Sequence, residues 1–183
     1  TFSLYAHQKD IELVFYSSVP TLEMDFIPSY IDKIVSNLLS NAINHTDAGG
    51  KIEFTVSKGK NSDTIAICIS DTGEGIAQES LKHIFDLFYQ SPQAKNTAGT
   101  GIGLAFTQMM VRKMKGEIEV ESELGKGSQF TVILPLKNKK LPYIQPLEEE
   151  EKEPIALSPK SDYTETKEED FTDILEDEKD DAD

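Results

Sequence analysis

Four hydrogen-bonding side chains fall on one flank of a predicted helix, and their types suit ligand binding. The helix is expected over residues 30–46, YIDKIVSNLLSNAINHT. At about 100° per residue, Asn37, Asn41, Asn44 and His45 lie together beside the apolar stripe of that helix. Polar groups beside a buried face are costly unless polar partners meet them there. The flank is therefore either a solvated helix edge or one wall of a ligand pocket, and the helix alone leaves both open.

A second candidate is the sequence DTGEGI at residues 71–76, which directly follows a predicted strand. The Asp71 carboxylate can accept a hydrogen bond from an amino group on a planar base. Gly73 and Gly75 allow the backbone to approach a ligand closely. Taken alone the pattern is weak evidence, because any hairpin can end in this way.

A third candidate is the glycine-rich sequence GTGIGL at residues 99–104, which leads into a predicted helix. Backbone N–H groups and the helix dipole at such a start favour a phosphate group. A dinucleotide-binding fingerprint would need a strand immediately before it, and a P-loop would need Gly-Lys-Ser/Thr after it. The sequence has neither, so both readings fail.

The elements that must position these residues alternate between helical and strand periodicity. Apolar residues at spacings of three and four predict the helix at 30–46, and a second helix is predicted at 102–115 with Gly116 as its C-cap. The remaining predicted elements are strands at 11–16, 51–57, 64–70, 117–122 and 128–136, and a short helix at 79–84. This order predicts an α+β fold: a two-layer α/β sandwich with a mixed sheet and helices on one face.

Charge and composition divide the chain into a globular part, residues 1–136, and a tail, residues 137–183. The tail holds 7 Lys and Arg against 17 Asp and Glu, within a chain of 183 residues and net charge −15. Few large apolar residues occur in it, so we expect a disordered linker or tail.

The same composition limits the partners and bound groups of the chain. The negative charge argues against nucleic acid or anionic lipid as a direct partner. No apolar run is long enough to span a membrane, so no direct membrane contact is expected. Cys68 is the single cysteine, which leaves no internal disulfide and no cysteine-based zinc site.

Taken in order, five sequence blocks resemble the N, G1, F, G2 and G3 boxes of the catalytic ATP-binding domain of sensor histidine kinases. The blocks are NLLSNAINHT, DTGEGI, IFDLFYQ, GTGIGLA and GKGSQFTVILP. That domain belongs to the GHKL superfamily, which includes gyrase, Hsp90 and MutL, and the resemblance covers residues 10–136. It implies the Bergerat ATP-binding fold, with ATP and Mg²⁺ as the bound groups.

The resemblance implies a role for each matched residue. Asn41 would ligate Mg²⁺, Asn37 would order the phosphates, and Asp71 would accept a hydrogen bond from the adenine amine. Asn37 and Asn41 are the catalytic candidates, and residues 91–98 would form a flexible lid over the phosphates. The nucleotide-binding residues that the resemblance implies are Asn37, Asn41, Asn44, His45, Asp71, Gly73, Gly75, Ile76, Phe85, Phe88, Gln90, Gly99, Thr100, Gly101, Ile102, Gly103, Leu104 and Ser128.

Some positions depart from the pattern of the histidine kinases. Asn44 stands where a Lys often reaches a phosphate, and His45 stands where Tyr is frequent. Gln90 stands where some members place a phosphate-contacting Arg, and Leu87 replaces a residue that is commonly polar or basic. Fewer cationic contacts predict a modest affinity for nucleotide.

The activity implied is transfer of the γ-phosphoryl group of ATP to a histidine on a dimerisation and phosphoacceptor domain, in two-component signalling. None of His7, His45 and His83 has the His-Glu/Asp context of a phosphoacceptor helix. The acceptor domain is therefore expected upstream of Thr1, and the fragment alone should be a monomer that does not phosphorylate itself. The resemblance also implies the cytoplasmic portion of a membrane-bound sensor, and the acidic tail resembles the linker that leads to a receiver domain in hybrid kinases.

Three alternatives remain open. An ATPase of the gyrase or Hsp90 kind would need a Glu to activate water where Asn37 stands. A nucleotide-sensing module without catalysis and a kinase directed at Ser or Thr use the same residues for binding.

Overall fold

The apolar patterns fold into alternating strands and helices in the computed structural model, which describes residues 2–92 and 100–138. The strands are β1 Glu12–Ser17, β2 Lys51–Lys58, β3 Thr64–Asp71, β4 Glu117–Glu123 and β5 Gly127–Pro135. The helices are α1 Phe2–Gln8, α2 Pro28–His45, α3 Gln78–Leu81 and α4 Gly103–Lys113. The sequence pattern of residues 2–10 is too short to predict α1, which buries Ala6.

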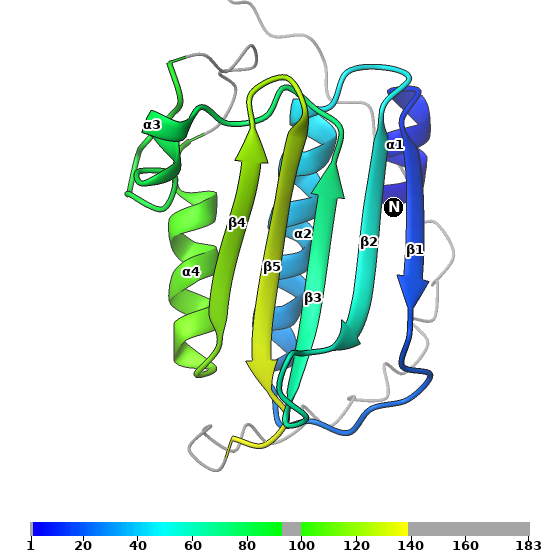
Figure 1. Ribbon diagram of the computed structural model, residues 1–183, viewed down its shortest axis with the longest axis vertical. Helices are drawn as coiled ribbons and strands as arrows, with labels where there is room; N and C mark the ends of the chain where they lie inside the picture. The colour runs from blue at the N-terminus through cyan, green and yellow to red at the C-terminus, as the bar shows by residue number, and fades with distance from the viewer. Residues whose placement is uncertain (1, 93–99, 139–183) are drawn as a thin grey trace, which may run out of the picture. The chain divides into compact units, whose positions relative to one another are not determined.

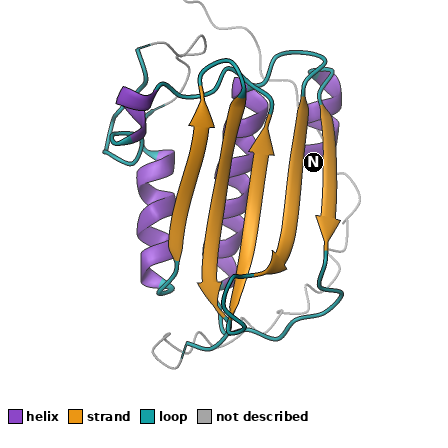
Figure 2. Cartoon of the chain, in the orientation of Figure 1, coloured by secondary structure: helices purple, strands orange, loops and turns teal. Residues whose placement is uncertain are grey.

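The five strands form one mixed sheet in the order β1-β2-β3-β5-β4, with helices packed on it (Figure 1, Figure 2). β1 and β2 are parallel, and α2 lies in the connection that parallel pairing requires. All other neighbouring strands are antiparallel. α1 and α2 lie behind the sheet in Figure 1, and α4 packs against α2 and β4. The mixed sheet with helices on one face is therefore confirmed.

The neighbouring strands β3 and β5 bury a row of apolar residue pairs beneath the helices. The pairs in register are Ile65 with Leu134, Ile67 with Val132 and Ile69 with Phe130, and all six residues are buried. Because side chains alternate along a strand, the next pair in this row is Asp71 with Ser128. Both are also buried, so the apolar row ends in a polar pair at one end of the sheet.

Helix α2 turns its apolar stripe toward this row. Its buried residues are Ile34, Leu38, Leu39, Ala42 and Ile43, as the spacing predicts. Two carbonyl groups in its last turn accept hydrogen bonds from side chains. Thr46 Oγ1 donates to the Ala42 carbonyl at 2.7 Å, and Lys9 Nζ donates to the Ile43 carbonyl at 2.9 Å. The end of α2 is thereby fixed beside the polar end of the sheet.

The C-terminus of α4 differs from the prediction. Gly116 is not the left-handed residue; Lys115 is, with φ 59°. The N–H of Lys115 donates to the Arg112 carbonyl and the N–H of Gly116 donates to the Val111 carbonyl, which together form a Schellman motif. Gly116 is required for another reason, because a Cβ there would lie 2.5 Å from the Ile133 carbonyl oxygen of β5.

The short helix predicted at 79–84 is also shorter than expected. α3 ends at Leu81, and the chain continues through turns in which His83 N–H donates to the Ser80 carbonyl and Asp86 N–H donates to the His83 carbonyl. These bonds span three residues rather than four, so the helix does not propagate.

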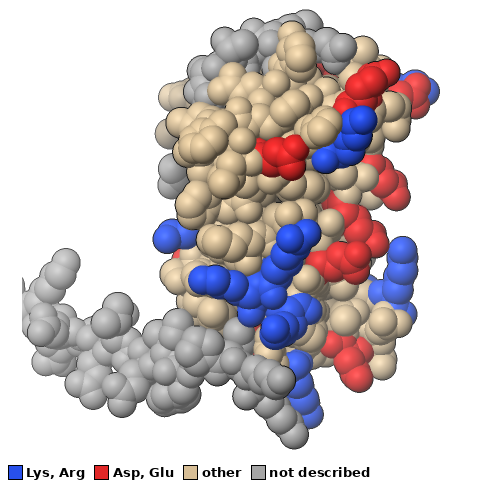
Figure 3. Space-filling view, turned by 90° about the vertical axis from the view of Figure 1, so that its left-hand side faces the viewer, with Lys and Arg blue, Asp and Glu red and all other residues tan. Residues whose placement is uncertain are grey.

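Charged side chains are segregated on the side of the molecule formed by α4 and β4, where Lys and Arg gather low in the view and Asp and Glu along one margin (Figure 3). Arg112 and Lys113 lie in the last turn of α4, where cations interact favourably with the helix dipole. The edge strand β4 exposes Glu117, Glu119, Glu121 and Glu123. Charged side chains on an edge strand discourage pairing with another sheet.

Across residues 2–92 and 100–138, no helix has the length and apolar character that crossing a membrane would take.

Candidate functional site

Three of the sequence candidates meet at one end of the molecule, the upper end in Figure 1. The C-terminal end of α2, the C-terminal end of β3 and the N-terminal end of α4 all lie there. The first brings Asn41, Asn44 and His45, the second brings Asp71, and the third brings Gly103. Packing thus brings residues that are distant in sequence to one end of the molecule.

The carboxylate of Asp71 accepts hydrogen bonds from backbone N–H groups just after β3 and at the start of β5. Its Oδ1 accepts the N–H of Gly73 at 2.9 Å and the N–H of Ser128 at 3.2 Å. Burial raises the pKa of Asp71 above the ordinary value of 3.8, and the two N–H groups oppose that rise. Both of these hydrogen bonds use Oδ1, so Oδ2 is the oxygen that can accept a hydrogen bond from a ligand.

The loop after Asp71 is fixed against the β4–β5 hairpin. Gly75 has φ 69°, and a Cβ there would lie 2.0 Å from the Glu123 carbonyl oxygen. The N–H of Ile76 donates to Ser122 Oγ at 2.8 Å. Ser122 Oγ in turn lies 3.0 Å from Ser128 Oγ. Ser128 therefore reaches Asp71 through its backbone N–H, while its side chain joins the hairpin.

The amides on the flank of α2 have different surroundings. Asn37 Nδ2 donates to Thr107 Oγ1 of α4 at 2.7 Å. Asn44 Oδ1 accepts a hydrogen bond from the Tyr5 hydroxyl at 3.0 Å. Asn41, one helical turn from Asn37, is half-buried. Asn37 therefore contacts α4 and Asn44 contacts α1, although helical spacing places all three amides on one flank of α2.

His45 pairs with the loop that follows β3. Its Nδ1 lies 2.6 Å from Glu74 Oε1, and its carbonyl oxygen accepts the N–H of Glu74 at 3.1 Å. A Cβ on Gly73 would lie 2.1 Å from the same carbonyl oxygen, which explains why glycine is needed there. The end of α2 and the loop after β3 are therefore packed directly against each other.

The F-box segment touches the glycine-rich segment. The N–H of Phe88 donates to the Gly101 carbonyl at 2.8 Å, and Phe88 has φ 65° with a side chain that is 71% exposed. Gly101 has φ 67°, and a Cβ there would lie 2.6 Å from the Phe88 carbonyl carbon. Phe85 and Leu104 instead pack against the core.

The other expected residues of these segments are placed as follows. Gln90 and Thr100 are exposed, and Ile102 is half-buried immediately before α4. Gly99 and residues 93–98 of the expected lid lie outside the described residues, as does the tail from residue 139 onward.

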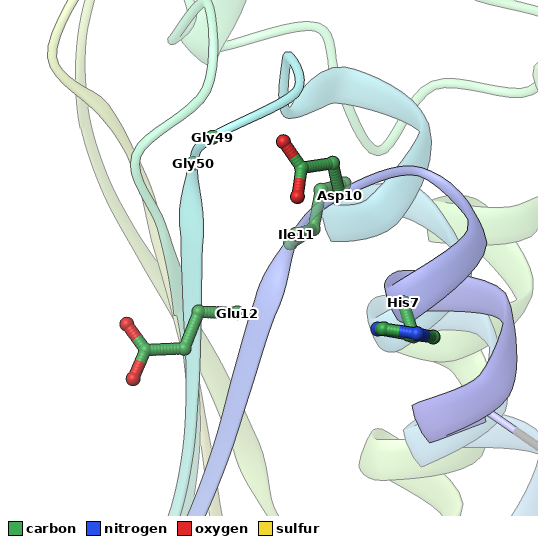
Figure 4. A pocket seen from close by; sticks show the side chains of 6 residues that line it. All are labelled: His7, Asp10, Ile11, Glu12, Gly49 and Gly50. Atoms are coloured by element: carbon green, nitrogen blue, oxygen red, sulfur yellow. The ribbon is translucent and has the colours of Figure 1, made fainter.

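Two hollows lie near this end of the molecule. One, of about 380 Å³, is lined by the expected residues Asn44 and His45, together with Glu74. The other, of about 300 Å³, lies between α1 and the starts of β1 and β2 (Figure 4). There the Glu12 carboxylate points away from the His7 imidazole, so the polar side chains do not converge on one ligand. The second hollow contains none of the expected site residues.

Sequence reasoning missed three residues of the region. Glu74 and Ser122 hold the loop after β3, and Thr107 holds Asn37. Thr107 carried a usable signal, because a hydroxyl in the apolar stripe of a helix needs a polar partner. Glu74 and Ser122 carried none, since their partners are set by the packing of the hairpin.

Comparison with known proteins is consistent with this geometry. Residues 27–138 match the sequence model of the family described as Histidine kinase-, DNA gyrase B-, and HSP90-like ATPase. The sensor histidine kinase RppB of Synechocystis sp. is 43% identical over 110 residues, which are 59% of this chain and 24% of RppB. The sensor histidine kinase RcsC of Escherichia coli strain K12 is 41% identical over 111 residues, which are 60% of this chain and 11% of RcsC. The chain thus spans about a quarter or less of these relatives.

Two solved structures have the same fold. The catalytic domain of the histidine kinase ThkA superposes with a TM-score of 0.65 at 23% identity, covering 75% of this chain and 88% of that one. Full-length ShkA, solved in complex with AMPPNP, superposes with a TM-score of 0.64 at 30% identity, covering 73% of this chain and 27% of that one.

Proposed function

This chain belongs to the family of histidine kinase-, DNA gyrase B- and HSP90-like ATPases, as a catalytic domain of the sensor histidine kinase kind, and we propose that it binds Mg²⁺-ATP and donates the γ-phosphoryl group to a histidine. The nucleotide would lie at the end of the sheet where α2, β3 and α4 meet. The observation that carries the proposal is the buried Asp71 carboxylate with one oxygen committed to backbone N–H groups.

Asp71 suits the recognition of adenine. Its Oδ2 can accept a hydrogen bond from the exocyclic amine of the base, and a carboxylate at this position cannot donate one to a carbonyl group. Gly73 and Gly75 let the loop after Asp71 pack closely against the carbonyl oxygens of His45 and Glu123, where a Cβ would lie 2.1 Å and 2.0 Å away. The residues present therefore fit adenine better than a base that carries an oxygen at the same position.

The opposite end of the site suits phosphates. Helix α4 begins at Gly103, and within the described residues no side chain caps its N-terminus. Its first N–H groups and its dipole favour an anion there. The side chain of Asn41 could ligate Mg²⁺ through its amide oxygen, which is a ligand type that Mg²⁺ accepts alongside phosphate oxygens. Bound Mg²⁺ would neutralise charge on the phosphates during transfer.

Phosphoryl transfer is better supported than hydrolysis. Water activation needs a general base beside the phosphates, and Asn37 cannot act as one. Its amide is also engaged by Thr107. We propose that the residues of this chain bind and orient the nucleotide, while the acceptor histidine comes from a dimerisation and phosphoacceptor domain of the same protein.

Two further proposals concern the whole protein. Because ATP is the phosphoryl donor, we place this domain in the cytoplasm as part of a sensor. We also propose that the acidic residues 137–183 lead to a receiver domain, on the ground of their composition. Reading the gene beyond Asp183 tests this, and a stop codon at that point would remove the receiver.

The test of the main proposal combines binding and transfer. Calorimetry should show that the chain binds ATP more tightly with Mg²⁺ than without it, and more tightly than GTP. Incubation with γ-labelled ATP should leave the chain unlabelled until the acceptor domain is supplied, after which acid-labile label should appear on that domain. Equal affinity for ATP and GTP, or acid-labile label on the chain alone, would contradict the proposal.

A further inference from the structure

A fully buried hydroxyl on α4 holds one of the amides of α2. Thr107 is 0% exposed and lies on the same face of α4 as the buried Met110 and Val111. Its Oγ1 accepts a hydrogen bond from Asn37 Nδ2 at 2.7 Å. A buried hydroxyl without a partner is costly, and this bond provides one.

The other end of the same amide rests against the start of α4. A Cβ on Gly103 would lie 2.4 Å from Asn37 Oδ1, so a side chain at this position would displace the amide. Gly103 and Thr107 are one turn apart on α4. The Asn37 amide therefore spans the first turn of α4, with its nitrogen held by Thr107 and its oxygen beside Gly103.

This contact lies next to the phosphate end of the site. Helix α2 runs toward the upper end of Figure 1, and α4 starts there and runs in the opposite direction. Asn41, one turn beyond Asn37 along α2, therefore lies nearer that end than the contact itself. An amide nitrogen carries two N–H donors, and the bond to Thr107 uses one of them. The second would be the donor that remains for a phosphate at this end of the site.

We propose that Thr107 is a positioning residue for phosphate binding: its hydroxyl fixes the Asn37 amide and the first turn of α4 in the arrangement that receives the phosphates of the nucleotide. This inference rests on the proposed function, because it needs a nucleotide at the site. Packing alone does not require a hydroxyl here. Valine has nearly the same shape as threonine but lacks the hydroxyl, so it would fill the same space and leave the Asn37 amide without this acceptor.

Thr107→Val removes the hydroxyl and keeps the volume, while Thr107→Ser keeps the hydroxyl. Thr55→Val makes the same change on β2, outside the site. Calorimetry with the full chain measures affinity for adenosine, Mg²⁺-ADP and Mg²⁺-ATP, and thermal melting reports stability. In Thr107→Val the affinity for Mg²⁺-ATP should fall about tenfold, the effect of one ordinary hydrogen bond, while that for adenosine stays the same. Thr107→Ser and Thr55→Val should keep the wild-type ratio of ATP to adenosine affinity.

An unchanged ratio in Thr107→Val would overturn the inference, because a purely structural role lowers the melting temperature without discriminating between ligands. If Thr107→Val does not fold, the same comparison is made with Thr107→Ala, and an unchanged ratio there overturns the inference equally. The wild-type chain tests the proposed function separately. If the wild type binds no nucleotide, or gains no affinity from the phosphates, the proposed function fails; if it binds and only the variant ratio is unchanged, the inference about Thr107 fails alone.

Discussion

The replacement of Asp71 by Asn tests the site most directly, because the structure fixes the orientation of the new side chain. Two backbone N–H groups, from Gly73 and Ser128, point at the position of Oδ1. In Asp71→Asn the amide oxygen must take this position, because the NH₂ group cannot accept those hydrogen bonds. The NH₂ group then occupies the position of Oδ2, where it would face the amine of adenine, and two donors would oppose each other.

The size of the effect follows from two contributions. A hydrogen bond to a charged acceptor is lost, and a donor is left facing a donor in a buried place. Together they should weaken ATP binding by about 2–4 kcal/mol, or roughly thirty- to a thousandfold in Kd. Inosine triphosphate has an oxygen where ATP has the amine, so the new NH₂ group can donate to it. The preference for ATP over inosine triphosphate should therefore shrink or reverse in Asp71→Asn.

Stability should change in the opposite direction. Burial raises the pKa of Asp71, so the ionised carboxylate costs folding free energy at neutral pH. This cost is absent below the ordinary pKa of 3.8, grows as the pH rises, and is complete above the raised pKa. Asp71→Asn removes the cost, so it should melt at the same temperature as the wild type or higher at pH 7. The difference should vanish as the pH falls toward 3.8.

The assay is a pair of calorimetric titrations, with ATP and with inosine triphosphate, and thermal melts at several pH values. Asp32→Asn on the exposed face of α2 makes the same chemical change outside the site and should alter neither ligand preference. Wild-type ATP affinity in Asp71→Asn would refute the role of Asp71 in reading the base. A loss of affinity for both ligands by equal factors would refute the fixed orientation of the amide.

Three more changes test other parts of the molecule. Asn41→Ala should lose about 1–3 kcal/mol of Mg²⁺-ATP affinity and keep its affinity for adenosine, and its melting temperature should not fall because Ala favours helix. An equal loss of ATP affinity with and without Mg²⁺ would argue against Asn41 as a metal ligand. Lys115→Gly should raise the free energy of unfolding, measured in urea, by about 1 kcal/mol, because glycine adopts the left-handed backbone conformation at φ 59° without the strain of a Cβ. An unchanged free energy would mean that the Lys side chain makes a compensating contact. Gly127→Ala should lower that free energy by about 2–3 kcal/mol, since its Cβ would lie 1.9 Å from the Asp71 carbonyl oxygen; a stable variant would show that the β4–β5 turn can move.

Local periodicity was enough to predict most of the fold. The spacing in the helix at 30–46 identified the buried Ile34, Leu38 and Ile43, and alternation identified the central strands. Alternation also contained a signal that went unused. Ile65, Ile67, Ile69 and Asp71 occupy alternate positions, so the pattern alone placed a carboxylate on the buried face of the sheet.

Features decided by long-range packing could not be predicted. The left-handed residue after α4 is Lys115 rather than Gly116, and the glycine instead lies where the chain passes the Ile133 carbonyl of β5. The contact of His45 with Glu74 likewise depends on how the loop after β3 lies against α2. The spacing of residues in the sequence carries no information about either of these two long-range contacts.

The ends of β3 and α4 have a consequence for how much the chain between them can vary. Residues 72–102 lead from the end of β3 to the start of α4, and both of these ends lie at the upper end of the molecule in Figure 1. For a flexible loop the entropy lost on closure grows only with the logarithm of its length, so doubling such an excursion costs about 0.6 kcal/mol. Insertions in the segment that carries the F box and the glycine-rich loop should therefore cost the sheet little. Length variation in this family of domains is expected to accumulate between β3 and α4, where the fold tolerates it and the candidate ligand-binding residues can be rearranged.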